Sequence, residues 1–426
     1  MDKKQDDTLK PQLSLFEAIA TGLAAILGAG IFAIIAPAAG IAGPAILVSF
    51  CIAAFVAFCN ALSSVQLAAA FPRSGGTYEF GRRMLGDGWG YVAGWMFLVA
   101  NTFGPGVSAL AFGSYLSAVW PAIPERVAAI GIAAVIIVLD AAGIRRSVRV
   151  TSVIVVLSIA SLLAVAVIAL PSAHLSNFTP FAPEGVVGVL RATGLLFFAY
   201  TGYSRIATLV EEVRNPKRTI PKASMIALGT VALLYLFVAG TAIAVLGASG
   251  VANSSSPLEA MMIAVSSGVG VVLVAGGALL TTFNEGLSDL LGVSRVAFAM
   301  GRESDLPKGL AKLGGDKNPW RSVIFVGAIT LVVAAFAPLE TAVAVSSFGT
   351  LLYYSITNVS ALKLPGAKRR FPRALAVAGL VGCLGLAFLL PPEYVVIGLV
   401  ILAVGLAFRV LRQRIQQPKK QAPQTV

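Results

Sequence analysis

The chain has 426 residues, of which 57% are apolar and only 12% are charged, and its formal net charge is +13. A soluble domain typically carries about a quarter charged residues, so this composition excludes an ordinary soluble protein. The Lys and Arg residues form short clusters between apolar runs and no basic stripe with interleaved aromatics, which excludes a nucleic-acid-binding protein.

Apolar runs of about 20 residues recur along the chain, and each is long enough to cross a bilayer. Because the lipid core offers no water to backbone groups, each run should form a helix. The runs cover 14–35, 44–70, 86–120, 126–141, 150–170, 188–209, 223–246, 265–297, 323–337, 341–362, 374–390 and 394–410. We therefore predict an all-α integral membrane protein with about twelve membrane-spanning helices.

Basic residues collect in every second loop between these runs. Clusters such as Arg145, Arg146 and Arg149 share one side of the predicted bundle with the amino terminus, whereas the other side holds little more than Arg126. The positive-inside rule then predicts an even number of spans with both termini in the cytoplasm. The polar start of the chain does not resemble a signal peptide, so we expect a multi-pass protein of the cytoplasmic membrane.

Two of the runs contain glycines where a continuous helix would be weakened. The first run has Gly28 and Gly30, and the sixth has Gly202, followed by Arg205. Close packing of helices is one explanation for such glycines. Matching interruptions in the first helices of two halves instead favour a transporter binding site at half depth. An opened helix presents N–H groups to an anion and C=O groups to a cation, which suits a zwitterionic substrate.

Five sequence motifs, taken in order, resemble those of the amino acid–polyamine–organocation permease superfamily. They stand at 28–32, 71–78, 198–203, 211–221 and 294–307. The resemblance covers nearly the whole chain and implies a leucine-transporter-type fold with two inverted five-helix repeats plus two additional helices. It divides the chain into a cytoplasmic segment (1–13), two repeats (14–170 and 188–362), two additional helices (374–410) and a cytoplasmic tail (411–426). It also implies alternating access.

The resemblance further implies where the substrate binds. Its carboxylate would meet the N–H groups of Ala29 and Gly30 beside Gly28, and its ammonium would meet carbonyl groups near Gly202. These carbonyl groups belong to Ile26, Phe198 and Thr201. The aromatic rings of Phe198 and Tyr203 would wall or gate the pocket, although ordinary helix packing explains Tyr203 equally well.

Ionisable residues inside the predicted membrane-spanning helices indicate a second set of functional residues. Glu285 and Asp289 lie one helical turn apart on the same face, with Arg205 as the obvious partner. Three interpretations remain open: a structural or gating ion pair, a carboxyl that couples proton movement to transport, and recognition of a cationic substrate side chain. Ser158, together with Ser288, could instead line a sodium site.

These patterns predict a secondary transporter that moves amino acids by alternating access. A carrier of polyamines or cationic amino acids is the alternative, because two carboxyls lie within the spans. A membrane enzyme is excluded, because the chain offers only His174, in a polar loop, for catalysis. We expect no cofactor and no metal site, and coupling to a proton or sodium gradient or to exchange. The expected partners are the amino acid substrate and the lipid bilayer; the sequence identifies no protein partner.

Overall fold

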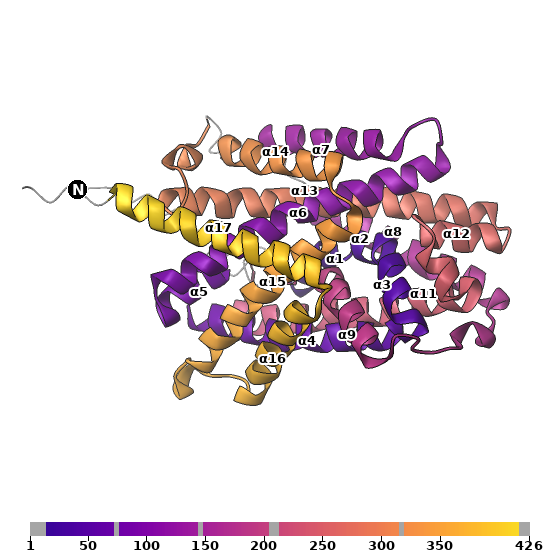
Figure 1. The fold of residues 1–426 in the computed structure, drawn as a ribbon, viewed down its shortest axis with the longest axis horizontal. Coiled ribbons are helices and arrows are strands. Elements are labelled where there is room, and N and C mark those ends of the chain that lie inside the picture. Colours follow the sequence, from indigo (N-terminus) through magenta and orange to yellow (C-terminus); the bar gives the residue numbers. More distant parts are fainter. Residues whose placement is uncertain (1–13, 72–75, 144–147, 204–212, 315–318, 417–426) are drawn as a thin grey trace, which may run out of the picture.

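The computed structural model describes residues 14–71, 76–143, 148–203, 213–314 and 319–416. Every regular element within these ranges is helical, and most helices run roughly along the long axis of the molecule (Figure 1). The α-helices are α1 (Leu15–Ile26), α2 (Ala29–Ala33), α3 (Ile35–Ala42), α4 (Ile46–Ala70), α5 (Gly76–Leu85), α6 (Asp87–Val119), α7 (Glu125–Ala141), α8 (Val148–Ala169), α9 (Gly185–Leu196), α11 (Pro216–Ala252), α12 (Pro257–Ala264), α13 (Gly268–Arg302), α14 (Trp320–Phe336), α15 (Leu339–Leu362), α16 (Arg373–Leu389) and α17 (Pro392–Gln416). The 3₁₀ helices are η1 (Gly43–Ala45), η2 (Leu170–Ser172), η3 (Leu175–Phe178), η4 (Phe197–Tyr200), η5 (Lys308–Ala311) and η6 (Gly366–Lys368).

The composition of these helices is that of a membrane protein. Within the described residues, 7 helical stretches are long and apolar enough to cross a bilayer, and shorter apolar helices accompany them. Val153, Val156 and Leu157 of α8 are 58%, 58% and 52% exposed, which lipid tails can cover far better than water. The all-helical class is confirmed for this part of the chain, whereas the division into two inverted repeats stays a prediction.

Three helices lie outside the predicted apolar runs. They are α3, which continues the first run beyond its predicted end, and α5 and α12, which lie at opposite ends of the long axis (Figure 1). α5 was missed because it mixes Glu79, Arg82 and Arg83 with apolar residues and has no long hydrophobic stretch. α5 contributes to a cluster of charged side chains, and α12 carries a buried acid; both are described below.

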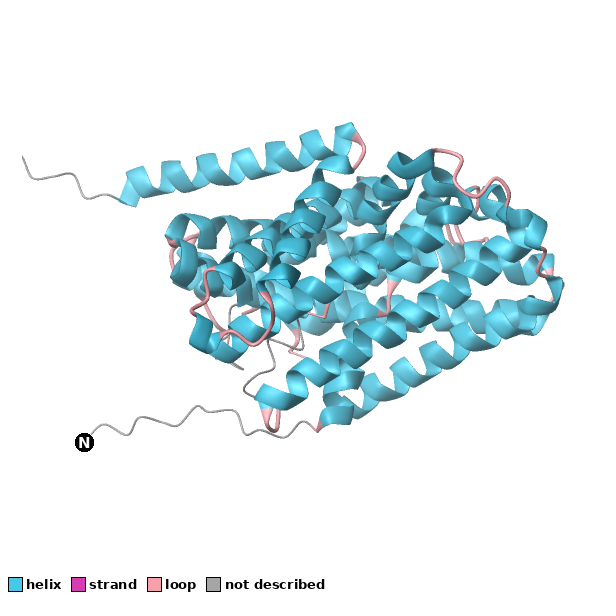
Figure 2. Ribbon diagram, turned by 90° about the horizontal axis from the view of Figure 1, so that it is seen from below, coloured by secondary structure: helices cyan, strands magenta, loops and turns pink. Residues whose placement is uncertain are grey.

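The centre of the bundle is formed by long helices that contact several partners. α6 packs against α13, α15 and α7, and α1 packs against α11 and α8. α17 lies along the outer edge of the bundle and is mostly exposed (Figure 2). The interrupted first run therefore lies among the buried helices, away from the lipid-facing edge.

The first apolar run is interrupted between α1 and α2. α1 ends at Ile26, Leu27 has extended dihedral angles, and α2 begins at Ala29. Gly28 has a φ of −174°, which any residue can adopt, so its backbone conformation does not require glycine. Its lack of a side chain matters instead, because a Cβ atom there would lie 1.9 Å from Cδ of Glu285.

The sixth run is interrupted after η4. Thr201 is extended, and Gly202 has a φ of +106°, a region that strongly favours glycine. A Cβ atom on Gly202 would also lie 2.0 Å from the carbonyl oxygen of Ala25. Steric space and backbone conformation thus both require glycine at this position.

Replacing Gly202 by alanine should destabilise the fold. We expect Gly202→Ala to lower the free energy of unfolding by about 1–3 kcal/mol, because the residue is forced to keep an unfavourable φ against the Ala25 carbonyl. Thermal unfolding of the purified protein in detergent measures the change.

Gly229→Ala in α11 is the matched control, because no atom lies within 4 Å of its Cβ position. Alanine favours a helix over glycine by about 1 kcal/mol, so this variant should be as stable as the parent or more so. Equal midpoints for the two variants would contradict the role assigned to Gly202.

Candidate functional site

The two interruptions lie against each other. α2 packs on η4, and a Cβ atom on Gly30 would lie 2.7 Å from Cα of Ala199 and 2.5 Å from its Cβ. Gly202 approaches Ala25 at the end of α1 in the same way. Glycines at both breaks therefore allow the two interrupted backbone segments to contact each other directly. Close packing was one of the two explanations for these glycines considered from the sequence.

The Glu285 carboxyl lies at the break in the first run. The backbone N–H of Ala29 donates a hydrogen bond to Oε2 of Glu285 at 2.7 Å, and the Ser108 hydroxyl donates to the same oxygen at 2.6 Å. Glu285 is 5% exposed, and its carboxyl fills the space beside Gly28. The family resemblance implies that the Ala29 N–H binds the carboxylate of the substrate. In this structure the same N–H binds the carboxyl group of Glu285.

Asp289 follows Glu285 on the same face of α13, toward α6. A Cβ atom on Gly104 would lie 2.7 Å from Oδ2 of Asp289, so a glycine again makes room for a carboxyl. Ser108 and Gly104 are one turn apart on α6, as Glu285 and Asp289 are on α13. The two carboxyls therefore lie on one face of α13, as their spacing predicted, and the structure adds that this face packs against α6.

Ser158 of α8 contacts α13 one turn before Glu285. Its hydroxyl is 2.5 Å from the Thr281 hydroxyl and donates to the Ile154 carbonyl at 2.8 Å. Thr281 precedes Glu285 by one helical turn and lies on the same face of α13, so Ser158 packs against the face that carries the carboxyl. Ser158 thus belongs to the same neighbourhood as the break, through a threonine that the sequence analysis had not selected.

The predicted acceptors for an ammonium group already take hydrogen bonds within the protein. The Tyr235 hydroxyl donates to the Ile26 carbonyl at 3.1 Å. The Phe198 carbonyl accepts from the Thr201 N–H at 3.0 Å and from its hydroxyl at 2.8 Å. A carbonyl oxygen has two lone pairs, so the Ile26 carbonyl can accept a further hydrogen bond, whereas the Phe198 carbonyl already accepts two from Thr201.

The aromatic residues at the sixth run are deeply buried. Phe198 is 4% exposed, and Tyr203 is 1% exposed and stacks on Tyr354 with ring centroids 5.1 Å apart. The Tyr203 hydroxyl has no hydrogen-bond partner in this structure. Tyr203 therefore packs against α15, which is the simpler of the two roles considered for it, while Phe198 lies in η4 against the break. Arg205, the predicted partner of the carboxyls, lies outside the described residues.

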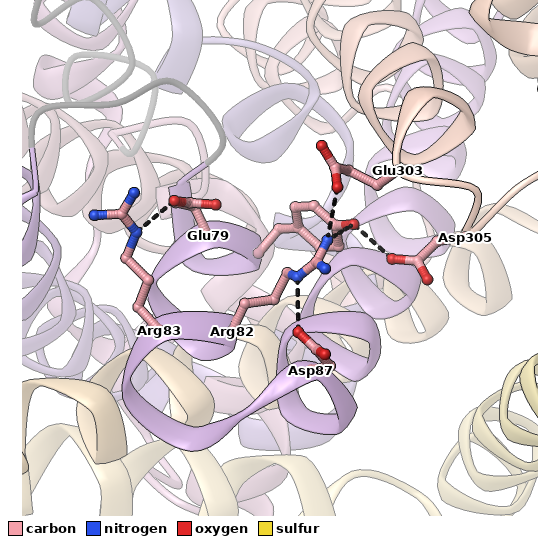
Figure 3. Close-up of polar contacts among 7 residues, drawn as sticks. Glu79, Arg82, Arg83, Asp87, Glu303 and Asp305 are labelled. Atoms are coloured by element: carbon pink, nitrogen blue, oxygen red, sulfur yellow. Dashed lines mark hydrogen bonds and ion pairs between the residues drawn. The ribbon is translucent and has the colours of Figure 1, made fainter.

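A separate polar cluster joins α5 to the end of α13 (Figure 3). Arg82 bonds to Asp87 at 3.1 Å, to Glu303 at 3.3 Å and to the Tyr78 hydroxyl at 2.9 Å. The Tyr78 hydroxyl in turn donates to Asp305 at 2.5 Å. Burial, followed by the hydrogen bond to Asp305, raises the pKa of Tyr78 above its usual range. This cluster links α5, α6 and the end of α13 at the end of the bundle that carries α5.

The described residues at the two breaks are tightly packed. Gly28 lies against the Glu285 carboxyl and Gly30 against Ala199, with no room for a Cβ atom at either glycine. Two surface grooves of about 360 and 270 Å³ lie elsewhere, one between α4 and α9 and one between α16 and α17. None of the predicted site residues lines either groove. A ligand that contacts Gly28 or Gly30 directly therefore has to displace Glu285 or Ala199.

Besides Thr281, two residues of this site could not be found from the sequence. Ser108 is one of three serines in its apolar run, Tyr235 is the lone tyrosine of its run, and neither belongs to a recognisable motif. Only the packing of α6 and α11 around the break brings them to Glu285 and Ile26. Within the described residues, no group of three or more His, Cys, Asp or Glu side chains is arranged to hold a metal ion.

Comparison with known proteins shows which proteins the whole chain is similar to. A family profile described as "Amino acid permease" matches residues 13–410. An uncharacterized transporter of Mycobacterium tuberculosis is 43% identical over 97% of this chain and 94% of its own length. The branched-chain amino acid permease BcaP of Bacillus subtilis is 28% identical over 90% of this chain and 87% of its own. The methylthioribose transporter of the same organism is 26% identical, with coverages of 85% and 83%.

Removing the Ser108 hydroxyl should destabilise the centre of the bundle. Ser108→Ala takes one donor from a buried carboxyl, and we expect a loss of about 1–3 kcal/mol in the free energy of unfolding. Ser355→Ala is the control, because that hydroxyl bonds only to the Leu351 carbonyl of its own helix and should change stability little. The thermal unfolding midpoints of the two variants are compared at the same pH. If Ser108→Ala loses no more stability than Ser355→Ala, the Ser108 hydroxyl does not stabilise the centre of the bundle through Glu285.

Proposed function

Because the chain belongs to the amino acid permease family, we propose that it carries amino acids across the membrane by alternating access, with the substrate held at the two opened helices. Membership in this family confirms the superfamily resemblance noted from the sequence and identifies a multi-pass membrane transporter, not an enzyme. Family membership does not identify the substrate, because one relative is named for branched-chain amino acids and another for methylthioribose.

One observation carries the proposed binding mode: the Ala29 N–H holds a carboxyl group. Its 2.7 Å hydrogen bond to Glu285 supports the idea that the opened helix can bind the carboxylate of an amino acid. The carbonyl groups of Ile26, Phe198 and Thr201 are then proposed to accept from the ammonium group. Gly28, Gly30 and Gly202 keep the backbone accessible, and Phe198 and Tyr203 bound the site.

Substrate binding in this scheme requires Glu285 to leave Ala29. A carboxyl that moves from two donors into an apolar bundle is favoured in its neutral form, so its departure would be linked to uptake of a proton. We therefore favour coupling to a proton gradient through Glu285, with Asp289 beside it. A sodium gradient, with Ser158 and Thr281 near the ion, or simple exchange are outcomes that the experiment below distinguishes.

The proposed topology follows from the charge distribution. Both termini and the α5 cluster would face the cytoplasm, and α12 would face the opposite side, because basic residues collect on the α5 side. The repeats 14–170 and 188–362 would then be inverted copies that place the two breaks at matching depths, in the cytoplasmic membrane.

A carrier of cationic amino acids or polyamines is the second candidate. The presence of two carboxyls, Glu285 and Asp289, along the α6–α13 interface favours it, because a cationic side chain could pair with either. In that case the Glu285 carboxyl would bind the substrate, and uptake of arginine or a polyamine would exceed uptake of branched-chain amino acids.

Uptake by purified protein in liposomes tests the proposed function. We expect at least one radiolabelled amino acid to accumulate, and Gly28→Ala to weaken its binding about tenfold or more, because the new methyl group occupies the space beside Ala29. Gly385→Ala in α16 is the control, since no atom lies within 4 Å of its Cβ position. Normal binding by Gly28→Ala would place the site elsewhere.

The pH dependence of uptake tests the role of Glu285. If this carboxyl carries the coupled proton, Glu285→Gln should abolish accumulation driven by a proton gradient while leaving equilibrium exchange active. Asp289→Asn is measured in parallel, and unchanged pH dependence and substrate range in that variant would make Asp289 structural. Accumulation driven by sodium alone would overturn the proton scheme without affecting the binding site.

A further inference from the structure

Glu259 is a buried acid at the α12 end of the bundle. It is 3% exposed, and its Oε2 atom has no hydrogen-bond partner in this structure. α12 lies at the end of the long axis opposite α5 (Figure 1). Buried carboxyl oxygens without partners are uncommon, so this one requires an explanation.

Helix capping does not explain Glu259. Ser256 and Glu259 have the spacing of a capping box, in which the acid accepts from the backbone N–H of the serine. Here the Ser256 N–H donates to the Ser254 hydroxyl at 3.2 Å, and α12 has no side-chain cap hydrogen bond. The carboxyl is thus buried without accepting from the backbone N–H at the start of its own helix.

The surroundings of Glu259 offer no compensating base. α12 packs against α11, α13, α8 and α2, and the halves of these helices beside α12 contain no acidic or basic residue. The titratable group that faces Glu259 is the Tyr115 hydroxyl of α6. Burial raises the pKa of Glu259, and the neighbouring Ser256 hydroxyl opposes this effect. The packed position of α12 therefore favours the neutral acid.

α12 is tied to the interrupted first run through two adjacent residues of α6. The Ser114 hydroxyl donates to the Ser255 carbonyl at 2.9 Å, just before α12. The Tyr115 hydroxyl donates to the Phe32 carbonyl of α2 at 2.7 Å. Opening this end of the bundle toward the break at Gly28 would have to separate α12 from α2 and admit water to Glu259.

We propose that Glu259 is a proton-binding site that controls the opening of the α12 end of the transporter. The acid is neutral while α12 is packed on α2, and it releases its proton to the solution on that side when α12 moves away and water solvates the carboxylate. Closing the end takes one proton back from the same solution. Because the neutral form belongs to the closed state, acid on the α12 side stabilises closure and alkaline solution favours opening.

This site differs from the coupling role proposed for Glu285. Glu259 exchanges its proton with one side only, so it regulates access without carrying a proton across the membrane. The inference depends on the proposed function only in that α12 has to move during transport. A failure to find substrate uptake would leave the behaviour of α12 measurable.

Hydrogen–deuterium exchange of the α12 peptide tests the proposal without a substrate. After correction for intrinsic exchange, protection of residues 257–264 in the wild-type protein should rise about tenfold or more as the pH falls from about 8 to about 5. Glu259→Gln, which resembles the neutral acid, should stay protected across this range. Glu259→Asp should restore a pH dependence, since it keeps an ionisable group.

Glu184→Gln is the matched control, because this acid is exposed and should leave the pH dependence of α12 as in the wild type. Protection in the wild-type protein that does not change with pH would overturn the proposal, even if the Glu259→Gln variant fails to fold. A pH dependence that persists unchanged in Glu259→Gln would overturn it as well.

Discussion

The hydrogen bond between the Ala29 amide and the Glu285 carboxyl is the contact on which the centre of this bundle depends. Opening a helix inside a membrane leaves peptide groups without partners, and each such group costs several kcal/mol in hydrocarbon. Glu285 satisfies the freed amide from α13, and Ser108 of α6 holds the same oxygen. Gly28 allows the carboxyl to approach because it has no side chain in the way.

This contact explains why the described residues at the first break are tightly packed. A carboxyl from the protein lies where an amino acid carboxylate is proposed to bind, and Gly30 packs directly on Ala199. Substrate and Glu285 would therefore compete for one donor, so binding and a change in the position of α13 side chains become linked. The two ends of the bundle carry different polar groups, charged contacts around Arg82 at α5 and the buried Glu259 at α12.

Much of the architecture could be predicted because its causes are local. Apolar runs indicated the helices, and Gly28 and Gly202 marked the places where helical structure stops. The contacts of Ser108, Tyr235 and Thr281 could not be predicted, because their partners are far away in the chain. α5 and α12 were missed for a different reason, since neither has the long apolar run that reveals a membrane helix.

The sequence by itself determined that this is an all-helical permease of the membrane. The length of the apolar runs and the order of the motifs can be recognised without knowing the tertiary contacts. Only the tertiary structure decided which partners each polar group contacts there. It placed Glu285 on Ala29, a contact that none of the three interpretations drawn from the sequence had included. It also buried Glu259, an acid in a short connection between two long helices, because burial depends on which helices pack around a residue.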